Sequence, residues 1–267
     1  MDVAAVTRYS RGENFPVGSL VFPRPLRRHI RALYCYARLV DQFGDAFEGD
    51  RLAVLDELER DLEACYGGEP EWAVMRALQP TIRACSLPRE PFVRLIEANR
   101  MDQRIDEYAT WDDLKEYCRH SADPCGRLVL GVLRRADDPE CVAASDDVCT
   151  GLQLVNFLQD VPRDLELGRI YLPADERRRF GVVALDRPSE PLRRLLAFEA
   201  ERARALLAAG ARLERLLGGR VGRAVRLFAR GGLAALEALD RADYDVFTSR
   251  PRPSRARLAR AALASLL

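Results

Sequence analysis

The sequence predicts an all-α protein, and three observations support this prediction. Apolar residues recur at the helical period along most of the 267-residue chain. Nowhere do several alternating strand patterns follow one another. Prolines divide the chain into segments of helical length, at Pro23, Pro70, Pro88, Pro124, Pro139 and Pro188. We therefore expect a bundle of helices.

The predicted helices follow in order between these prolines. Five of them begin at or just after a proline, namely 24–44, 70–85, 89–107, 140–165 and 189–218. A sixth, 122–135, carries Pro124 in its first turn, where proline is tolerated. The helices 50–66, 111–119 and 220–241, and a short one near the C-terminus, depend on apolar periodicity alone.

A single domain over residues 1–267 is the expected organisation. No Ser/Gly-rich linker and no internal repeat interrupts the chain. With 48% apolar residues, a chain of this length can bury one large core without help. The sequence thus predicts a single large helical bundle.

Two pairs of aspartates, each four residues apart, are the strongest functional signal. Asp41 and Asp45 lie in the first predicted helix, and Asp160 and Asp164 lie in the helix 140–165. On a helix this spacing places both carboxylates of a pair on one face. Two such faces across a cavity would supply oxygen ligands for Mg²⁺, which in turn would hold a diphosphate. The sequence therefore predicts a metal-dependent enzyme whose bundle has a central cavity.

Polar neighbours extend each acidic face. Tyr34 and Arg38 share the narrow helical stripe of the first pair, and Gln153 and Asn156 lie roughly on the face of the second. A solvated surface is the alternative for either pair alone, because acidic pairs of this spacing also occur elsewhere in the chain. Two flanked pairs on otherwise apolar helices favour the metal site.

Composition and missing motifs narrow the chemistry. The formal charge is +1, which does not suggest binding to nucleic acid. The chain has no dinucleotide-binding glycine motif, P-loop, nucleophile elbow or zinc-protease motif. Histidine is limited to His29 and His120, so any metal must be held by oxygen ligands.

The redox state and location follow from the cysteines and the ends of the chain. The seven cysteines form no C-x-x-C pair, which indicates reduced and mostly buried thiols. The N-terminus has no signal-peptide pattern, and no apolar run reaches the roughly 18 residues that cross a bilayer. We therefore expect a cytoplasmic protein. The last residues, with Arg255, Arg257 and Arg260 opposite leucines, leave peripheral membrane contact open beside a docked terminal helix.

Five segments of the chain form one recognisable pattern. They are Glu13-Asn14-Phe15-Pro16, Tyr34 to Asp41, Tyr117-Cys118 with Gly126, Gln153 to Asp160, and Gly168 to Pro173. This pattern resembles the head-to-head prenyl synthases, the squalene/phytoene synthase family, and implies an isoprenoid synthase type I fold. The first segment, the stretch His120 to Pro124 and Gln159 look closest to hydroxysqualene synthase of bacterial hopanoid biosynthesis.

The resemblance also implies an activity. Presqualene diphosphate would lose its diphosphate with the help of two or three Mg²⁺ ions, the carbocation would rearrange, and water would capture it to give hydroxysqualene. No NADPH is expected, in agreement with the missing dinucleotide motif. Sibling enzymes of the hopanoid pathway would be partners. A condensing squalene, phytoene or presqualene diphosphate synthase is the first alternative, and a non-catalytic assembly or binding factor is the second.

The roles of individual residues carry over from the resemblance. The metal-binding set is Asp41, Asp45, Asn156, Asp160 and Asp164. The diphosphate contacts are Tyr34, Arg38, Asp102 and Gln153, and the residues counted as catalytic are Asp41, Asp160 and Tyr117. Tyr117 would lie beside the reacting carbons, where its oxygen or ring stabilises cationic character. The plain alternatives are a core aromatic for Tyr117, a surface charge for Asp102 and an intrahelical salt bridge for Arg38.

Three residues depart from the family pattern in ways that bear on the metal site. Gln42 stands where relatives commonly carry a second aspartate, and Gly44 is expected to loosen the helix between its two acids. Pro162 is expected to push the residue before it out of helical geometry, so that Asp164 no longer aligns with Asp160. These departures would weaken metal binding.

Two polar residues suggest how the product is decided. Ser121 and Asp123 lie where condensing relatives have small apolar or neutral residues along the cavity. A carbocation is quenched by the nearest nucleophile, so a group that fixes one water there would favour an alcohol. We therefore expect Ser121 and Asp123 to position water.

Overall fold

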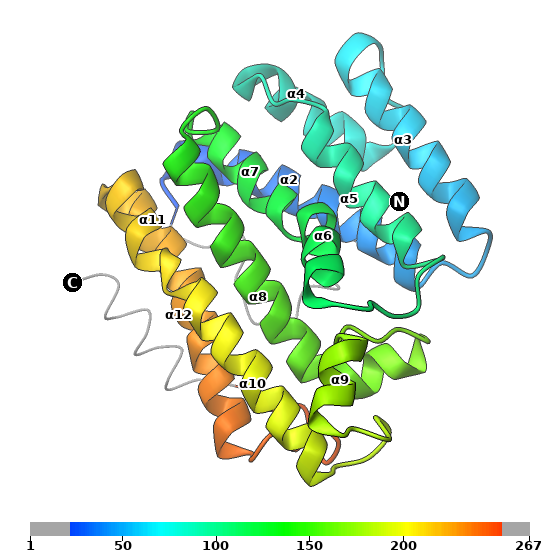
Figure 1. Cartoon of the computed structure of the whole chain (residues 1–267). Coiled ribbons are helices and arrows are strands. Elements are labelled where there is room, and N and C mark those ends of the chain that lie inside the picture. The colour runs from blue at the N-terminus through cyan, green and yellow to red at the C-terminus, as the bar shows by residue number, and fades with distance from the viewer. Residues whose placement is uncertain (1–21, 253–267) are drawn as a thin grey trace.

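The computed structural model describes residues 22–252, and helices are the regular elements of this part of the chain (Figure 1). They are α2 (Arg24–Asp45), α3 (Arg51–Gly67), α4 (Ala73–Cys85), α5 (Glu90–Met101), α6 (Trp111–Ser121), α7 (Asp123–Val132), α8 (Pro139–Glu166), α9 (Ala174–Phe180), α10 (Glu190–Leu207), α11 (Ala209–Leu217) and α12 (Gly219–Arg241). The all-α prediction is confirmed. The Glu13 to Pro16 motif and the terminal arginines lie outside the described residues.

The long helix α8 runs through the middle of the bundle (Figure 1). It contacts α10, α11 and α12 on one side and α6 and α7 on the other. Helix α2 contacts α3, α4, α5 and α7. Because α7 packs against both α2 and α8, these two helices lie on either side of a shared interior.

Capping residues decide where several of these helices begin. Thr110 and Asp113 form a reciprocal capping box at the start of α6, and Asp138 accepts hydrogen bonds from the first backbone N–H groups of α8. Each cap of this kind contributes about 1 kcal/mol to stability. Since α6 carries Tyr117 and α8 carries the second acidic pair, these caps fix the frame of the cavity.

Three helix predictions differ from the structure. The predicted helix 89–107 ends at Met101, because the following segment leaves the helix to pair with the chain around Ile170, whose N–H donates to the carbonyl of Asp106 at 2.7 Å. The predicted helix 189–218 is broken at Ala208 into α10 and α11. The break turns α11 onto α12, where a methyl group added at Gly210 would lie 2.5 Å from Cβ of Ala229. Helix α9 was not predicted, because its seven residues are too short to show a period.

The expectation that Pro162 misaligns the second acidic pair is wrong. Helix α8 continues through Pro162 to Glu166. Proline has no backbone N–H, so one backbone hydrogen bond of α8 is missing. The packing of the buried residues Leu158 and Val161 nevertheless stabilises the helix. Asp164 therefore keeps its helical register with Asp160.

Gly44 has a packing role that the sequence did not reveal. It lies in the last turn of α2, where a Cβ would stand 1.8 Å from Oδ1 of Asn99 on α5. Its carbonyl also accepts a hydrogen bond from Nε2 of Gln103 at 3.1 Å. The absent side chain thus allows α2 and α5 to approach closely just beside Asp45.

We expect Gly44→Ala to destabilise the fold by about 1–3 kcal/mol, because Asn99 must leave its position to make room. Urea unfolding measures the difference, and Gly44→Ala combined with Asn99→Ala should recover part of it. Gly67→Ala is the matched control, since nothing lies within 4 Å of a Cβ at that helical position. Equal stability of the Gly44→Ala and Gly67→Ala variants would contradict this role.

A buried charged cluster ties α9 to α10. Arg202 donates to both oxygens of Glu199 at 2.6 and 2.7 Å and to Oε1 of Glu176 at 2.5 Å. The same guanidinium lies over the ring of Trp111, 4.3 Å from its centroid. Burial, together with the nearby Glu176 carboxylate, raises the pKa of Glu199 to about 8, against the opposing effect of Arg202.

This cluster predicts a fall in stability as the pH rises from about 5 to about 8. In the unfolded chain Glu199 loses its proton near its ordinary pKa, whereas the folded protein keeps it until pH 8, so the native state binds more protons across this range. The pKa of Glu176 is lowered, so the change in stability that the titration of Glu176 causes falls at more acidic pH. Glu199→Gln mimics the protonated acid and should flatten the dependence of Tm on pH. The exposed Glu201→Gln is the control, and parallel profiles for all three proteins would refute the assignment.

Candidate active site

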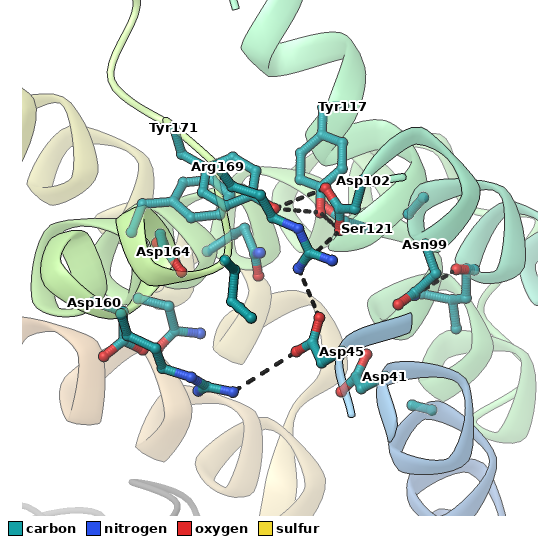
Figure 2. A pocket seen from close by; sticks show the side chains of 18 of the residues that line it. Asp41, Asp45, Asn99, Asp102, Tyr117, Ser121, Asp160, Asp164, Arg169 and Tyr171 are labelled. Carbon is teal, nitrogen blue, oxygen red and sulfur yellow. Dashed lines mark hydrogen bonds and ion pairs between the residues drawn. The ribbon is translucent and has the colours of Figure 1, made fainter. Parts of the chain in front are cut away.

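A cavity of about 400 Å³ collects the residues that the sequence marked as functional. It is bounded by side chains of α2, α5, α6 and α8 and of the segments that follow α8 and α12 (Figure 2). The predicted residues that line it are Tyr34, Arg38, Asp41, Asp45, Asp102, Tyr117, Ser121, Gln153, Asn156, Asp160 and Asp164. Asp123 is the one predicted site residue that does not line it.

Helix α2 forms one acidic wall of this cavity. Its opposite face is buried in the core through residues such as Tyr36, Leu39 and Phe43, which fixes the rotation of the helix about its axis. The polar stripe therefore turns to the cavity, as the spacing predicted. Arg38 lies 3.5 Å from the half-exposed carboxylate of Asp41, so the intrahelical salt bridge does form.

Helix α8 forms the facing wall. Leu154, Val155 and Leu158 are buried on its packed side, and this orients its polar stripe towards α2. Figure 2 shows Asp160 and Asp164 on one side of the pocket and Asp41 and Asp45 on the other. The two acidic pairs, more than a hundred residues apart in sequence, thus border a single cavity.

Arginines neutralise one acid on each wall. Asp45 is paired with Nη1 of Arg169 at 2.6 Å and with Nη2 of Arg163 at 3.7 Å. Asp160 is held by Arg250, with Nε and Nη2 lying 2.6 and 2.7 Å from its two oxygens. Each of these carboxylates must exchange a guanidinium for a metal ion if it is to act as a ligand.

The predicted oxygen cage is not preformed. Within residues 22–252, no three histidine, cysteine or acidic side chains are close enough together to hold one ion. The donor set nevertheless fits Mg²⁺, which usually binds through one or two carboxylates and completes its octahedron with water and substrate phosphate. Asp41 and Asp45 on one wall, and Asn156, Asp160 and Asp164 on the other, are the residues that would hold the ion together with a diphosphate.

Burial makes the two acids on α8 harder to ionise. Burial and the neighbouring charge of Asp160 raise the pKa of Asp164 to about 8, although Arg163 and Arg169 oppose the shift. Burial also raises the pKa of Asp160, against the effect of Arg250. Carboxylates that are costly to ionise in an empty cavity become favourable ligands when positive charge arrives.

Asp102 is the centre of a hydrogen-bonded cluster beside these walls. Its two oxygens accept hydrogen bonds from the hydroxyls of Tyr171 at 2.7 Å and Tyr117 at 2.8 Å. Arg169 lies 3.8 Å away (Figure 2). Burial raises the pKa of Asp102, whereas Arg169 and the two tyrosine hydroxyls lower it. The surface-charge alternative for Asp102 is wrong, since only 7% of its side chain is exposed.

Aromatic rings surround Tyr117 on the cavity wall. Its ring centroid lies 5.3 Å from that of Tyr171 and 6.2 Å from that of Phe157, and the last two rings are stacked at 4.2 Å. Tyr117 is buried, as the core-aromatic alternative expects, but it also lines the cavity and bonds to Asp102. The wall therefore presents π-faces close to the acidic groups.

Arg169, Tyr171 and Arg250 are site residues that were assigned no role from the sequence. A weak signal existed for the first two, because both lie in the segment Gly168 to Pro173 of the recognised sequence pattern. Arg250 reaches Asp160 across 90 residues, in a segment where Gln159 also donates to the carbonyl of Pro251. No local pattern reports such a contact.

A second cavity, of about 240 Å³, adjoins the first and is almost wholly apolar. The two share Tyr34, Ala37, Leu95 and Cys125 as lining residues. Leucines, valines and phenylalanines of α2, α7, α8, α11 and α12 line the remainder, together with Gly126. The interior therefore joins an acidic compartment to a hydrocarbon-like one.

Comparison with known proteins identifies the family. The family model of squalene/phytoene synthase matches residues 9–257. The chain belongs to the squalene/phytoene synthase family. Members of this family are prenyl-transferring synthases, and the all-α isoprenoid synthase fold predicted from the sequence is the fold of its solved members.

Several relatives of the family are similar over most of the chain. A hydroxysqualene synthase of Zymomonas mobilis is 35% identical over 73% of this chain and 67% of its own length. A hydroxysqualene synthase of Sinorhizobium fredii is 36% identical over 62% of this chain, a match that spans 56% of that relative. A phytoene synthase of Arthrospira platensis is 30% identical over 89% of this chain and 83% of its own length.

Solved structures give the same fold. The squalene synthase HpnC of Alicyclobacillus acidocaldarius has a TM-score of 0.83 and 47% identity, covering 91% of this chain and 94% of its own. A dehydrosqualene synthase has a TM-score of 0.90 at 24% identity, which shows the likeness of the fold alone.

Within residues 22–252, no helix of this family member is long and apolar enough to cross a membrane.

Proposed function

We propose that this family member converts presqualene diphosphate into hydroxysqualene by releasing diphosphate, rearranging the carbocation and adding water. The observation that carries the proposal is the pairing of two facing acidic walls with an adjoining apolar cavity. A substrate that carries both an anionic diphosphate and a hydrocarbon chain needs an interior with one acidic and one apolar cavity. The likeness to hydroxysqualene synthases of two bacteria supports this reaction over others of the family.

The diphosphate would bind at the acidic end. Its metal ligands would be the aspartates at 41, 45, 160 and 164 together with Asn156, and bound Mg²⁺ would stabilise the charge of the departing diphosphate. Tyr34, Arg38 and Gln153 line the same space and would donate hydrogen bonds to phosphate oxygens. These donors are fixed on two rigid helices, so little reorganisation is needed as charge develops.

The carbocation would lie between the two compartments. Tyr117, Tyr171 and Phe157 present their rings on the cavity side of the acidic cluster, where π-faces stabilise a cation without reacting with it. Asp102 accepts hydrogen bonds from the hydroxyls of Tyr117 and Tyr171 and thereby fixes the orientation of these two rings. The hydrocarbon arms would extend into the apolar cavity, away from bulk water. No nicotinamide takes part in this proposal.

The decisive experiment incubates the purified protein with presqualene diphosphate and Mg²⁺ in ¹⁸O-labelled water. The proposal requires release of diphosphate and an alcohol that carries the label. A wild-type protein that leaves presqualene diphosphate unchanged would refute it. The same proposal places the protein in the cytoplasm, next to enzymes that make and use these lipids. It also includes peripheral contact with the membrane, which is tested by flotation with anionic vesicles.

A condensing synthase is the second candidate, supported by the long match to a phytoene synthase. The same cavity chemistry would then join two prenyl diphosphates. Turnover of farnesyl or geranylgeranyl diphosphate alone distinguishes this reaction from the first. A non-catalytic binding factor would turn over neither substrate, and it would show no shift in Tm with Mg²⁺ and pyrophosphate together.

A further inference from the structure

One polar side chain of the cavity wall has its hydrogen-bonding capacity unused. Oγ of Ser121 is buried, and within residues 22–252 it has no hydrogen-bond partner. A buried hydroxyl without a partner costs about 1–3 kcal/mol, so native proteins satisfy such groups with water or a ligand. Ser121 lines the acidic cavity, where there is room for a small polar partner.

This hydroxyl lies on the acidic side of the junction between the two compartments. Ser121 is the last residue of α6, one helical turn after Tyr117. Cys125, four residues further on, lines both cavities. Figure 2 places Ser121 beside Tyr117 and Asp102, at the acidic cluster. Ser121 therefore stands where the diphosphate end of a substrate would meet its hydrocarbon end.

Four polar groups around Ser121 are occupied or unsuitable. The hydroxyls of Tyr117 and Tyr171 both donate to Asp102. The Cys125 thiol is exposed to the cavity, but desolvation by the surrounding protein raises its pKa to about 12, so it is a neutral and weak hydrogen-bonding group. Asp123, the other residue that we expected to hold water, accepts a hydrogen bond from Oγ1 of Thr150 at 2.9 Å and does not line either cavity. Among these groups, only Ser121 offers both a donor and an acceptor to the junction.

We infer that Ser121 is the residue that positions the water which captures the product cation, and this inference rests on the proposed function. The water donates one hydrogen bond to Oγ of Ser121, which directs an oxygen lone pair towards the cationic carbon. A C–O bond forms, and the resulting oxonium loses its proton to an oxygen of the released diphosphate. No oxidant or reductant is needed. Without the held water, the cation instead loses a proton from carbon to the same diphosphate and yields a hydrocarbon.

The test separates the product ratio from the rate of ionisation. Ser121→Ala is assayed with presqualene diphosphate and Mg²⁺ in ¹⁸O-labelled water, and both diphosphate release and the ratio of labelled alcohol to hydrocarbon are measured. We expect diphosphate release to stay within about twofold of wild type and the alcohol-to-hydrocarbon ratio to fall about tenfold, the scale of one lost hydrogen bond. Ser121→Thr keeps a hydroxyl and should retain the alcohol. Thr150→Val removes a buried hydroxyl outside the cavities and should leave the ratio unchanged.

Each outcome decides the matter. An unchanged alcohol ratio in Ser121→Ala overturns the inference and leaves the proposed function standing. Equal losses of alcohol and of diphosphate release in Ser121→Ala also overturn it, because they show a general effect on the site. A wild-type protein that releases no diphosphate from presqualene diphosphate overturns the proposed function, and the inference with it.

Discussion

Asp160→Asn will lower the rate of diphosphate release from presqualene diphosphate by about 10²- to 10³-fold. This is the usual cost of removing one group that stabilises charge in a transition state. Asparagine keeps the size of the side chain and can still accept a hydrogen bond from Arg250, so the fold is retained while the negative charge is lost. The rate is measured in single turnovers, with Mg²⁺ varied to separate weaker metal binding from slower chemistry.

Asp147→Asn is the matched control for this variant. Asp147 lies on the same helix α8 but is exposed and does not line either cavity. Its loss should change the rate by less than about twofold, as expected for a solvated charge. If Asp160→Asn behaved like Asp147→Asn, the acidic wall of α8 would have no part in the chemistry.

Arg169→Met will have the largest effect on stability. The guanidinium is only 7% exposed and stands between Asp45 at 2.6 Å and Asp102 at 3.8 Å, and it also approaches the carbonyl of Gly44 at 3.4 Å. Removing it leaves the buried carboxylate of Asp102 without a cation and leaves Asp45 with only the more distant Arg163. Breaking a buried pair in this way costs about 3–5 kcal/mol, measured as the free energy of unfolding in urea.

Two comparisons make the Arg169 prediction specific. Arg169→Lys should recover only part of the loss, because one ammonium cannot reproduce the two-nitrogen contact in which Nη1 bonds to Asp45 while Nη2 donates to the carbonyl of Gly44. Arg119→Met removes an exposed partner of Glu116 and should cost at most about 1 kcal/mol. A loss no larger for Arg169→Met than for Arg119→Met would show that the buried bridge contributes nothing to stability.

The helical frame and both acidic walls could be predicted from local sequence. An apolar face fixes how α2 and α8 rotate, and the spacing of their polar residues then determines which side chains reach the interior. Helix starts at prolines were equally visible, because each depends on neighbours within one turn.

Arg169 and Arg250 were given no role from the sequence, because their contacts join distant segments. Arg169 meets Asp45 across 124 residues, and Arg250 meets Asp160 across 90. Local rules also misjudged Pro162, whose cost to α8 is outweighed by tertiary packing, and Gly44, whose value lies in the approach of α5. Asp123 has the polarity of a site residue, but the turn from α6 to α7 directs its carboxylate to Thr150.

A crystal structure of the protein with Mg²⁺ and pyrophosphate decides whether the two acidic walls bind the diphosphate. We expect pyrophosphate between α2 and α8, with metal ions bridging its oxygens to Asp41 or Asp45 on one wall and to Asp160 or Asp164 on the other. Arg169 and Arg250 would then have given up at least one of their present carboxylate partners. Pyrophosphate bound elsewhere, or metal-free walls with both arginine pairs intact at saturating Mg²⁺, would contradict the account.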